Sequence, residues 1–121
     1  MTLSKVLVVE DDGDLRELVV AVLTDLGYGV LEAANADEAL QRLAAEDDVD
    51  LLFTDIVMPG AKDGFELARE ALHRRPELKL LYTTGFAREA GPEDVKAPVL
   101  KKPYRLSKMA AYVASALGNR A

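Results

Sequence analysis

Short, nearly continuous apolar runs alternate along the chain with longer segments in which apolar residues recur at helical spacing. The continuous runs are typical of strands buried on both faces of a parallel sheet. They occupy residues 5–9, 28–33, 49–54, 78–84 and 99–101. The spaced pattern is clearest after the first run, in a predicted helix that carries Leu15, Leu18, Val19, Val22, Leu23 and Leu26. The alternation predicts an α/β fold in which helices cover both faces of a parallel sheet.

Capping and helix-breaking residues delimit the predicted helices. Gly27 ends the first helix, as glycine often does just beyond a C-cap. Asn35, with Glu38 three residues later, resembles a capping box at the start of the second helix. Two further helices are predicted over residues 65–75 and 106–117. Residues 55–64 predict a loop, and residues 85–97, which contain Gly91 and Pro92, allow only a short helix.

Charged residues follow three of the predicted strands directly. Glu10 and Asp11 follow the first strand, Asp55 the third and Lys102 the fifth. Because parallel strands end on one edge of the sheet, where open α/β sheets bind ligands, these side chains are expected to converge. Carboxylates brought together repel one another, and a divalent cation would relieve that repulsion. Carboxylate oxygens suit Mg²⁺, with Asp11 and Asp55 as direct ligands and Glu10 acting through water.

The same edge carries the groups that phosphoryl transfer needs. An aspartate such as Asp55 can act as a nucleophile and form an acyl phosphate. Lys102 can meet a phosphoryl oxygen as a point charge, and Thr84, at the end of the fourth strand, can donate a hydroxyl hydrogen bond. Phosphoryl transfer depends mainly on positioning and on neutralisation of charge, which a cation, a lysine and a hydroxyl together supply.

Plain structural roles compete with these chemical ones. The acidic run from Glu10 could be the first turn of a helix, favoured by the helix dipole. Asp55 could be a turn residue and Lys102 a solvated loop lysine. Each structural reading weakens when the three positions are considered together. His73 is expected to face solvent, and the two arginines that follow it, at positions 74 and 75, are expected to be ordinary surface.

Composition limits the function further. The 121 residues predict one domain, 1–121, with no output segment, and the chain has no cysteine for a disulfide or a thiolate metal site. A formal net charge of −6 argues against sequence-independent nucleic-acid binding. No apolar stretch approaches the roughly 20 residues of a membrane span, and the N-terminus lacks a signal-peptide pattern. We therefore expect a cytoplasmic protein.

Five short motifs, in order along nearly the whole chain, resemble those of the receiver domains of two-component response regulators. They are VVEDD at 8–12, TDIVMP at 54–59, DG at 63–64, TTG at 83–85 and KKPY at 101–104. The resemblance implies a flavodoxin-like fold, with a five-stranded parallel sheet in the order 2-1-3-4-5. The last two motifs are similar to those of receivers attached to hybrid kinases and of related stand-alone receivers.

The resemblance also implies a role for each residue of the edge. Asp55 would accept a phosphoryl group from a histidine kinase or a histidine phosphotransfer protein. Glu10 and Asp11 resemble the acidic pair that holds Mg²⁺, to which Val57 would add its backbone carbonyl. Lys102 resembles the phosphate-binding lysine, and its bond to the following proline would be cis.

Thr84 resembles the family's switch hydroxyl and is preferred to Thr83 because it adjoins Gly85. The protein would catalyse its own phosphorylation and dephosphorylation rather than act as a conventional turnover enzyme. It would signal to a downstream partner through the face of the fourth and fifth strands, as a monomer or a weak dimer. Val99 stands where the family often has an aromatic switch residue, which puts aromatic gating in doubt.

Two other classes of function remain open. A phosphohydrolase of the haloacid-dehalogenase type also uses an aspartate nucleophile, but it needs a second acid two residues later, where this chain has Val57. A pseudo-receiver would bind partners without chemistry, and the full set of carboxylates with Lys102 argues against it. Turnover of phosphomonoesters would identify the first class, and the absence of phosphorylation would identify the second.

Overall fold

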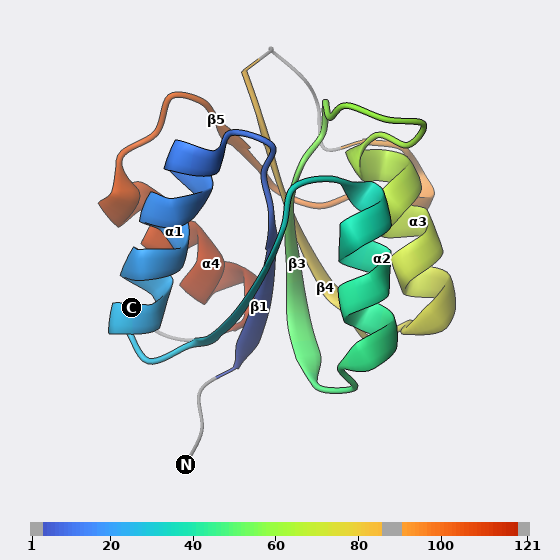
Figure 1. Ribbon diagram of the computed structural model, residues 1–121, viewed down its shortest axis with the longest axis horizontal. Coiled ribbons are helices and arrows are strands. Elements are labelled where there is room, and N and C mark those ends of the chain that lie inside the picture. The colour runs from blue at the N-terminus through green and yellow to red at the C-terminus, as the bar shows by residue number, and fades with distance from the viewer. Residues whose placement is uncertain (1–3, 86–90, 119–121) are drawn as a thin grey trace.

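Five parallel strands form a single sheet in the order β2-β1-β3-β4-β5, as the resemblance implied. The computed structural model describes residues 4–85 and 91–118 (Figure 1). The strands are β1 Lys5–Val9, β2 Gly29–Ala33, β3 Val49–Asp55, β4 Lys79–Thr84 and β5 Val99–Lys101. Because β1 and β3 lie at the centre of the sheet, their C-terminal ends are adjacent, and this adjacency positions the candidate site.

Helices cover both faces of the sheet, with α1 and α4 on one side and α2 and α3 on the other (Figure 1). Their bounds are α1 Gly13–Asp25, α2 Ala36–Ala45, α3 Gly64–Arg74 and α4 Leu106–Ala116. A short 3₁₀ helix, η1 Glu93–Val95, precedes β5. The prediction of only a short helix within 85–97 therefore holds over the part that the structure describes, and residues 86–90 lie outside it.

Alternate residues of each central strand belong to two separate hydrophobic cores. Leu52 packs with the side chains of α2 and α3, whereas its neighbour Phe53 packs with those of α1 and α4. Both side chains are almost fully buried. A strand with both faces covered must be apolar at every position, which is why these strands appear in the sequence as continuous apolar runs.

Helix starts follow local capping chemistry. The Asn35 side chain accepts a hydrogen bond from the backbone of Glu38, as the sequence predicted. Asp63 and Glu66 form a complete capping box at the start of α3, and the helix begins at Gly64, one residue before its predicted start. β3 extends to Asp55, so this residue ends the strand instead of opening the loop. The boundary matters because the strand ladder fixes the backbone of Asp55.

The expectation that Arg75 is ordinary surface is wrong. This residue is half-buried and donates to the carbonyl oxygens of Leu43 and Glu46 at the end of α2. It thereby satisfies carbonyls that the helix itself leaves unpaired. His73 is exposed, as predicted.

Candidate functional site

Backbone hydrogen bonds at the ends of the strands bring the predicted charged residues to one edge of the sheet. The Glu10 amide donates to the Ala33 carbonyl over 3.0 Å, which extends the pairing of β1 with β2. The Lys102 amide donates to the Thr84 carbonyl over 2.8 Å, which extends the pairing of β5 with β4. Asp55 is itself the last residue of β3. The three side chains therefore start from backbone positions that the sheet holds in place.

Close packing between β3 and α3 further fixes the backbone at Asp55. The Gly64 amide, at the start of α3, donates to the Ile56 carbonyl over 2.7 Å. A Cβ atom at position 64 would overlap the carbonyl oxygen of Asp55. Only glycine permits this approach, so the helix start rests directly against the strand that carries the carboxylate.

Lys102 bridges two buried carboxylates. Its Nζ lies 2.5 Å from Glu10 Oε1 and 2.8 Å from Asp55 Oδ1. Glu10 and Asp55 are each only 3% exposed. Water therefore screens this group of charges poorly, and each charge strongly affects the others.

The pKa values of the two carboxylic acids are shifted in opposite directions. Burial, followed by the contact with Glu10, raises the pKa of Asp55 to about 8, and Lys102 offsets only part of this rise. Burial also acts to raise the pKa of Glu10, but hydrogen bonds from Asp55 and Lys102 outweigh it and leave that pKa lowered. Burial acts to lower the pKa of Lys102, yet its contacts with Asp55 and Glu10 raise it. These shifts favour the protonated form of Asp55 beside an ionised Glu10 and the Lys102 ammonium.

The acidic cluster fits a divalent cation. Ligand atoms of Glu10, Asp11 and Asp55 lie within 4.8 Å of one another, and Asp11 is exposed to solvent. Asp55 Oδ2 is buried and has no hydrogen-bond partner among the described residues. A hard cation would supply that partner and would favour the ionised form of Asp55.

The remaining predicted residues surround this cluster. Val57 follows the end of β3, and its side chain is 48% exposed. Thr84 is buried at the end of β4, next to the backbone of Lys102. Thr83 is also buried and lies directly opposite Asp55 in the β3–β4 ladder. The Lys102–Pro103 peptide bond is cis, as expected.

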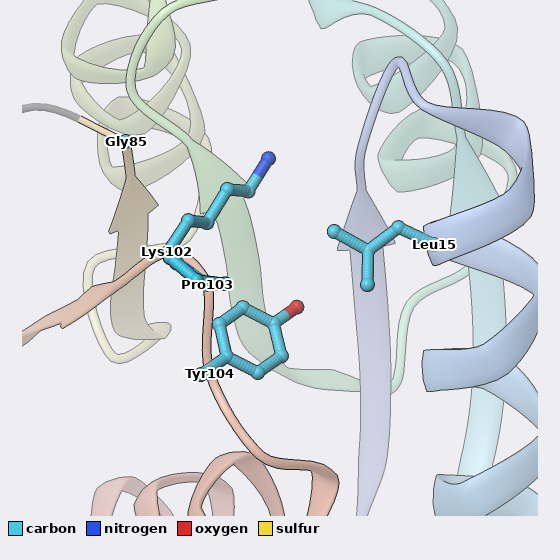
Figure 2. Close-up of a pocket in the computed structure, with 5 residues that line it drawn as sticks. All are labelled: Leu15, Gly85, Lys102, Pro103 and Tyr104. Atoms are coloured by element: carbon cyan, nitrogen blue, oxygen red, sulfur yellow. The ribbon is translucent and has the colours of Figure 1, made fainter.

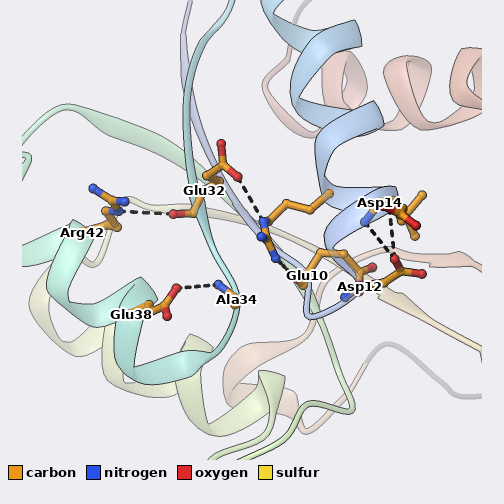
Figure 3. Close-up of polar contacts among 9 residues, drawn as sticks. Glu10, Asp12, Asp14, Glu32, Ala34, Glu38 and Arg42 are labelled. Atoms are coloured by element: carbon orange, nitrogen blue, oxygen red, sulfur yellow. Dashed lines mark hydrogen bonds and ion pairs between the residues drawn. The ribbon is translucent and has the colours of Figure 1, made fainter.

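Sequence reasoning missed two residues that hold Glu10 in place. Arg16 Nη1 donates to the Glu10 carbonyl oxygen over 2.7 Å, and its Nε donates to Glu32 Oε1 over 3.0 Å. The Asp12 amide donates to Glu10 Oε2 over 3.0 Å. The Asp12 side chain also caps α1 (Figure 3). An aspartate just before a predicted helix is a recognisable N-cap signal, whereas nothing local to the sequence indicates the arginine contact.

A pocket opens beside Lys102 on the α1 side of the sheet. Its volume is about 420 Å³, and it is lined by Leu15, Gly85, Lys102, Pro103 and Tyr104. Figure 2 shows the Tyr104 ring beside Lys102, with the hydroxyl on the side that faces Leu15. Burial, followed by the charge of Glu10, raises the pKa of the Tyr104 hydroxyl to about 12. This hydroxyl therefore stays neutral next to the charged cluster.

Known proteins resemble this chain in both sequence and fold. The response regulator receiver domain family matches residues 6–114. The response regulator receiver protein CpdR of Brucella abortus is 44% identical over 108 residues, a match that covers 86% of this chain and 88% of that protein. The sensor kinase CckA of the same organism is 37% identical over 113 residues, covering 89% of this chain but 12% of that protein.

A solved structure shows the likeness in fold. The response regulator protein TrrA of Thermotoga maritima, solved in complex with Mg²⁺ and BeF, superposes with a TM-score of 0.83 at 27% identity. The match covers 95% of this chain and 100% of the TrrA chain. No helix within residues 4–85 and 91–118 is long and apolar enough to cross a membrane. A buried pair of acids bridged by a lysine at the carboxyl end of a 2-1-3-4-5 sheet, together with these matches, places the chain among the response regulator receiver domains of two-component signalling.

Proposed function

We propose that Asp55 is the phosphoacceptor of this receiver domain. The observation that carries the proposal is the state of its carboxylate. One oxygen meets Lys102, the other is buried without a partner among the described residues, and two further acids lie within reach. This cost in desolvation has no structural benefit that an apolar side chain would not supply better. Charge held where a phosphoryl group can bind is typical of a catalytic site.

The proposed reaction is an in-line displacement at phosphorus. An oxygen of the Asp55 carboxylate forms a bond to the phosphorus of a phosphohistidine, the phosphorus–nitrogen bond breaks, and its electron pair leaves with the imidazole. Only the ionised carboxylate can attack, so the raised pKa of Asp55 must be overcome before transfer. Loss of its proton is favoured when a cation binds the cluster, since opposite charge lowers a carboxylate pKa.

Mg²⁺ is the proposed cofactor. Glu10, Asp11, Asp55 and the backbone carbonyl of Val57 would hold it, and bound there it would neutralise charge on the transferring phosphoryl group. The acidic cluster with its unpartnered oxygen supports this assignment. The Mg²⁺–BeF complex of the related TrrA supports it as well.

Lys102 and Thr84 are the proposed phosphate-binding residues. The Lys102 ammonium already touches the acceptor and would follow an oxygen of the phosphoryl group once Asp55 is modified. The Thr84 hydroxyl would donate to another such oxygen. Because the Thr84 carbonyl is bonded to the Lys102 amide, movement at Thr84 would be passed to β5 at the edge of the sheet. The face of β4 and β5 is accordingly the proposed surface for a downstream protein.

A histidine kinase or a histidine phosphotransfer protein is the proposed donor, and the acyl phosphate would be lost by hydrolysis within the domain. The test incubates the protein with phosphoramidate and MgCl₂ and measures its intact mass. We expect the mass of one phosphoryl group to appear, to require Mg²⁺ and to be absent from Asp55→Asn.

Asp50→Asn is the matched control, because Asp50 is an exposed residue of the same strand. That variant should be phosphorylated normally. Phosphorylation of Asp55→Asn at the normal rate would contradict the proposal. Turnover of simple phosphomonoesters by the unaltered protein would indicate a phosphohydrolase instead.

A further inference from the structure

Thr83 is a buried hydroxyl that the fold leaves without a partner. Its side chain is 3% exposed, and its Oγ1 accepts or donates no hydrogen bond within the described part of the chain. A buried hydroxyl without a partner lowers stability, and a valine of the same shape would avoid the loss. An unpartnered polar atom of this kind in a folded protein calls for a functional explanation.

The strand ladder places this hydroxyl next to the acceptor. Thr83 pairs with Asp55 across β3 and β4, and paired residues of neighbouring strands project to the same face of a sheet. That face carries Phe53 and Leu81, which belong to the core beneath α1 and α4. The side chains of Thr83 and Asp55 therefore stand side by side above that core.

Two unpartnered atoms of complementary chemistry thus occupy paired positions. Asp55 Oδ2 is a hydrogen-bond acceptor, and Thr83 Oγ1 can donate. The other acceptor oxygen, Asp55 Oδ1, is already held by Lys102 at 2.8 Å.

We propose that Thr83 is a positioning residue of the phosphoryl-transfer site, whose hydroxyl donates to the Asp55 carboxylate opposite Lys102. Held from both sides, the carboxylate keeps one orientation towards the incoming phosphorus, and each of its oxygens still has a lone pair for attack or for a cation. The inference rests on the proposed role of Asp55. It differs from the role proposed for Thr84, which binds the phosphoryl group itself.

A neighbouring threonine provides a contrast within the same structure. Thr54 is equally buried and adjoins Asp55 in the chain, but its Oγ1 already donates to the Asp55 carbonyl over 2.9 Å. Strand alternation also places its side chain on the opposite face of the sheet. Thr54 therefore has a structural partner and no access to the carboxylate, whereas Thr83 has the access and lacks the partner.

The test compares Thr83→Val, Thr83→Ser and Thr54→Val for the rate of phosphorylation by phosphoramidate with Mg²⁺ and for melting temperature. We expect Thr83→Val to react about three- to tenfold more slowly, as the loss of one hydrogen bond implies, without a lower melting temperature. Thr83→Ser, which keeps the hydroxyl, should recover the normal rate. Thr54→Val should melt at a lower temperature yet react at a rate close to normal.

The outcomes separate this inference from the proposed function. Full-rate phosphorylation of Thr83→Val, with modification still confined to Asp55, would overturn the role of Thr83 and leave that of Asp55 intact. Equal slowing of Thr83→Val and Thr54→Val would also overturn it, since a general packing effect would then explain both. Phosphorylation of Asp55→Asn would instead refute the function on which the inference rests.

Discussion

Each end of the sheet has a lysine that meets two carboxylates, and the two groups behave differently. At the N-terminal end, Lys5 lies 2.9 Å from Asp48 and 3.6 Å from Glu46. At the C-terminal end, Lys102 lies 2.5 Å from Glu10 and 2.8 Å from Asp55. The N-terminal carboxylates are exposed or partly exposed, whereas the other two are almost fully buried.

Burial is the largest cause of the difference between the pKa values of the acids at the two ends. The hydrogen bond between Asp48 and Lys5 lowers the pKa of Asp48, as expected for an exposed acid beside an ammonium. At the other end, burial raises the pKa of Asp55 despite the ammonium at 2.8 Å. Water screens the first group and is excluded from the second, so only the second holds repulsion that a ligand can relieve. The predictions below test this difference, starting with the largest effect.

Removal of the lysine should have opposite consequences at the two ends. Lys102→Ala should slow Mg²⁺-dependent phosphorylation by about 10²-fold, because a group that stabilises the transferring charge is lost. Lys5→Ala should leave that rate unchanged, since its partners are exposed acids far from the strand ends that carry Asp55. Time courses of intact mass measure both rates. Equal slowing of the two variants would show that the ends are not distinct.

A glycine-to-alanine substitution should also change stability by different amounts at the two ends of the sheet. Gly64→Ala should lower the free energy of unfolding by about 1–3 kcal/mol, because its Cβ would overlap the Asp55 carbonyl oxygen. Gly29→Ala, beside Lys5, meets only ordinary contacts with that side chain, so its effect should stay within about 0.5 kcal/mol. Urea unfolding measures both values. A Gly64→Ala protein as stable as the parent would contradict the close contact between α3 and β3.

The pH dependence of stability should come from the buried end. Between the ordinary pKa of Asp55, 3.8, and its raised value of about 8, the folded protein keeps a proton that the unfolded chain releases. Stability therefore falls as pH rises through this window. The melting temperature in EDTA should decrease from about pH 5 to about pH 8, and Asp55→Asn should reduce the decrease.

The exposed end supplies the control for the pH experiment. The lowered pKa of Asp48 gives a contribution that is present above its ordinary pKa of 3.8 and is lost only in acid. Asp48→Asn should therefore show the same decrease in melting temperature from about pH 5 to about pH 8 as the unaltered protein. A slope that persists in full in Asp55→Asn would show that the buried acid is not its source.

Mg²⁺ should have the smallest effect on stability, and only through the buried end. At ten times its dissociation constant, the ion should add about 1.4 kcal/mol to the free energy of unfolding. Asp11→Asn should reduce this gain, and Asp48→Asn should not, although both residues are exposed acids. Melting curves across a MgCl₂ titration measure the gain. An equal gain in both variants would indicate general ionic screening.

The sequence predicted the fold well because its strongest signals are local. Continuous apolar runs indicated buried strands, and the charged residues directly after them had to share one edge of a parallel sheet. The meeting of Glu10, Asp11, Asp55 and Lys102 followed from that rule, while the roles assigned to these residues remain predictions. The order of the strands came from the resemblance, since no local pattern sets it.

Contacts between distant residues were the ones that the sequence could not supply. Arg75 pairs with carbonyls about thirty positions earlier in the chain, and Arg16 supports the backbone of Glu10 from the next helix. The raised pKa of Asp55 depends on burial, which residue types alone do not fix. The unpartnered Thr83 hydroxyl likewise emerged only from the strand register.

Identification of the residue that carries the phosphoryl group tests the central claim most directly. The phosphorylated protein, treated with borohydride to reduce any acyl phosphate to an alcohol, can be digested and its peptides sequenced by mass. The account predicts reduction at Asp55 alone, and only when Mg²⁺ was present during phosphorylation. Reduction at Glu10 or Asp11 instead, or at no carboxylate, would contradict it.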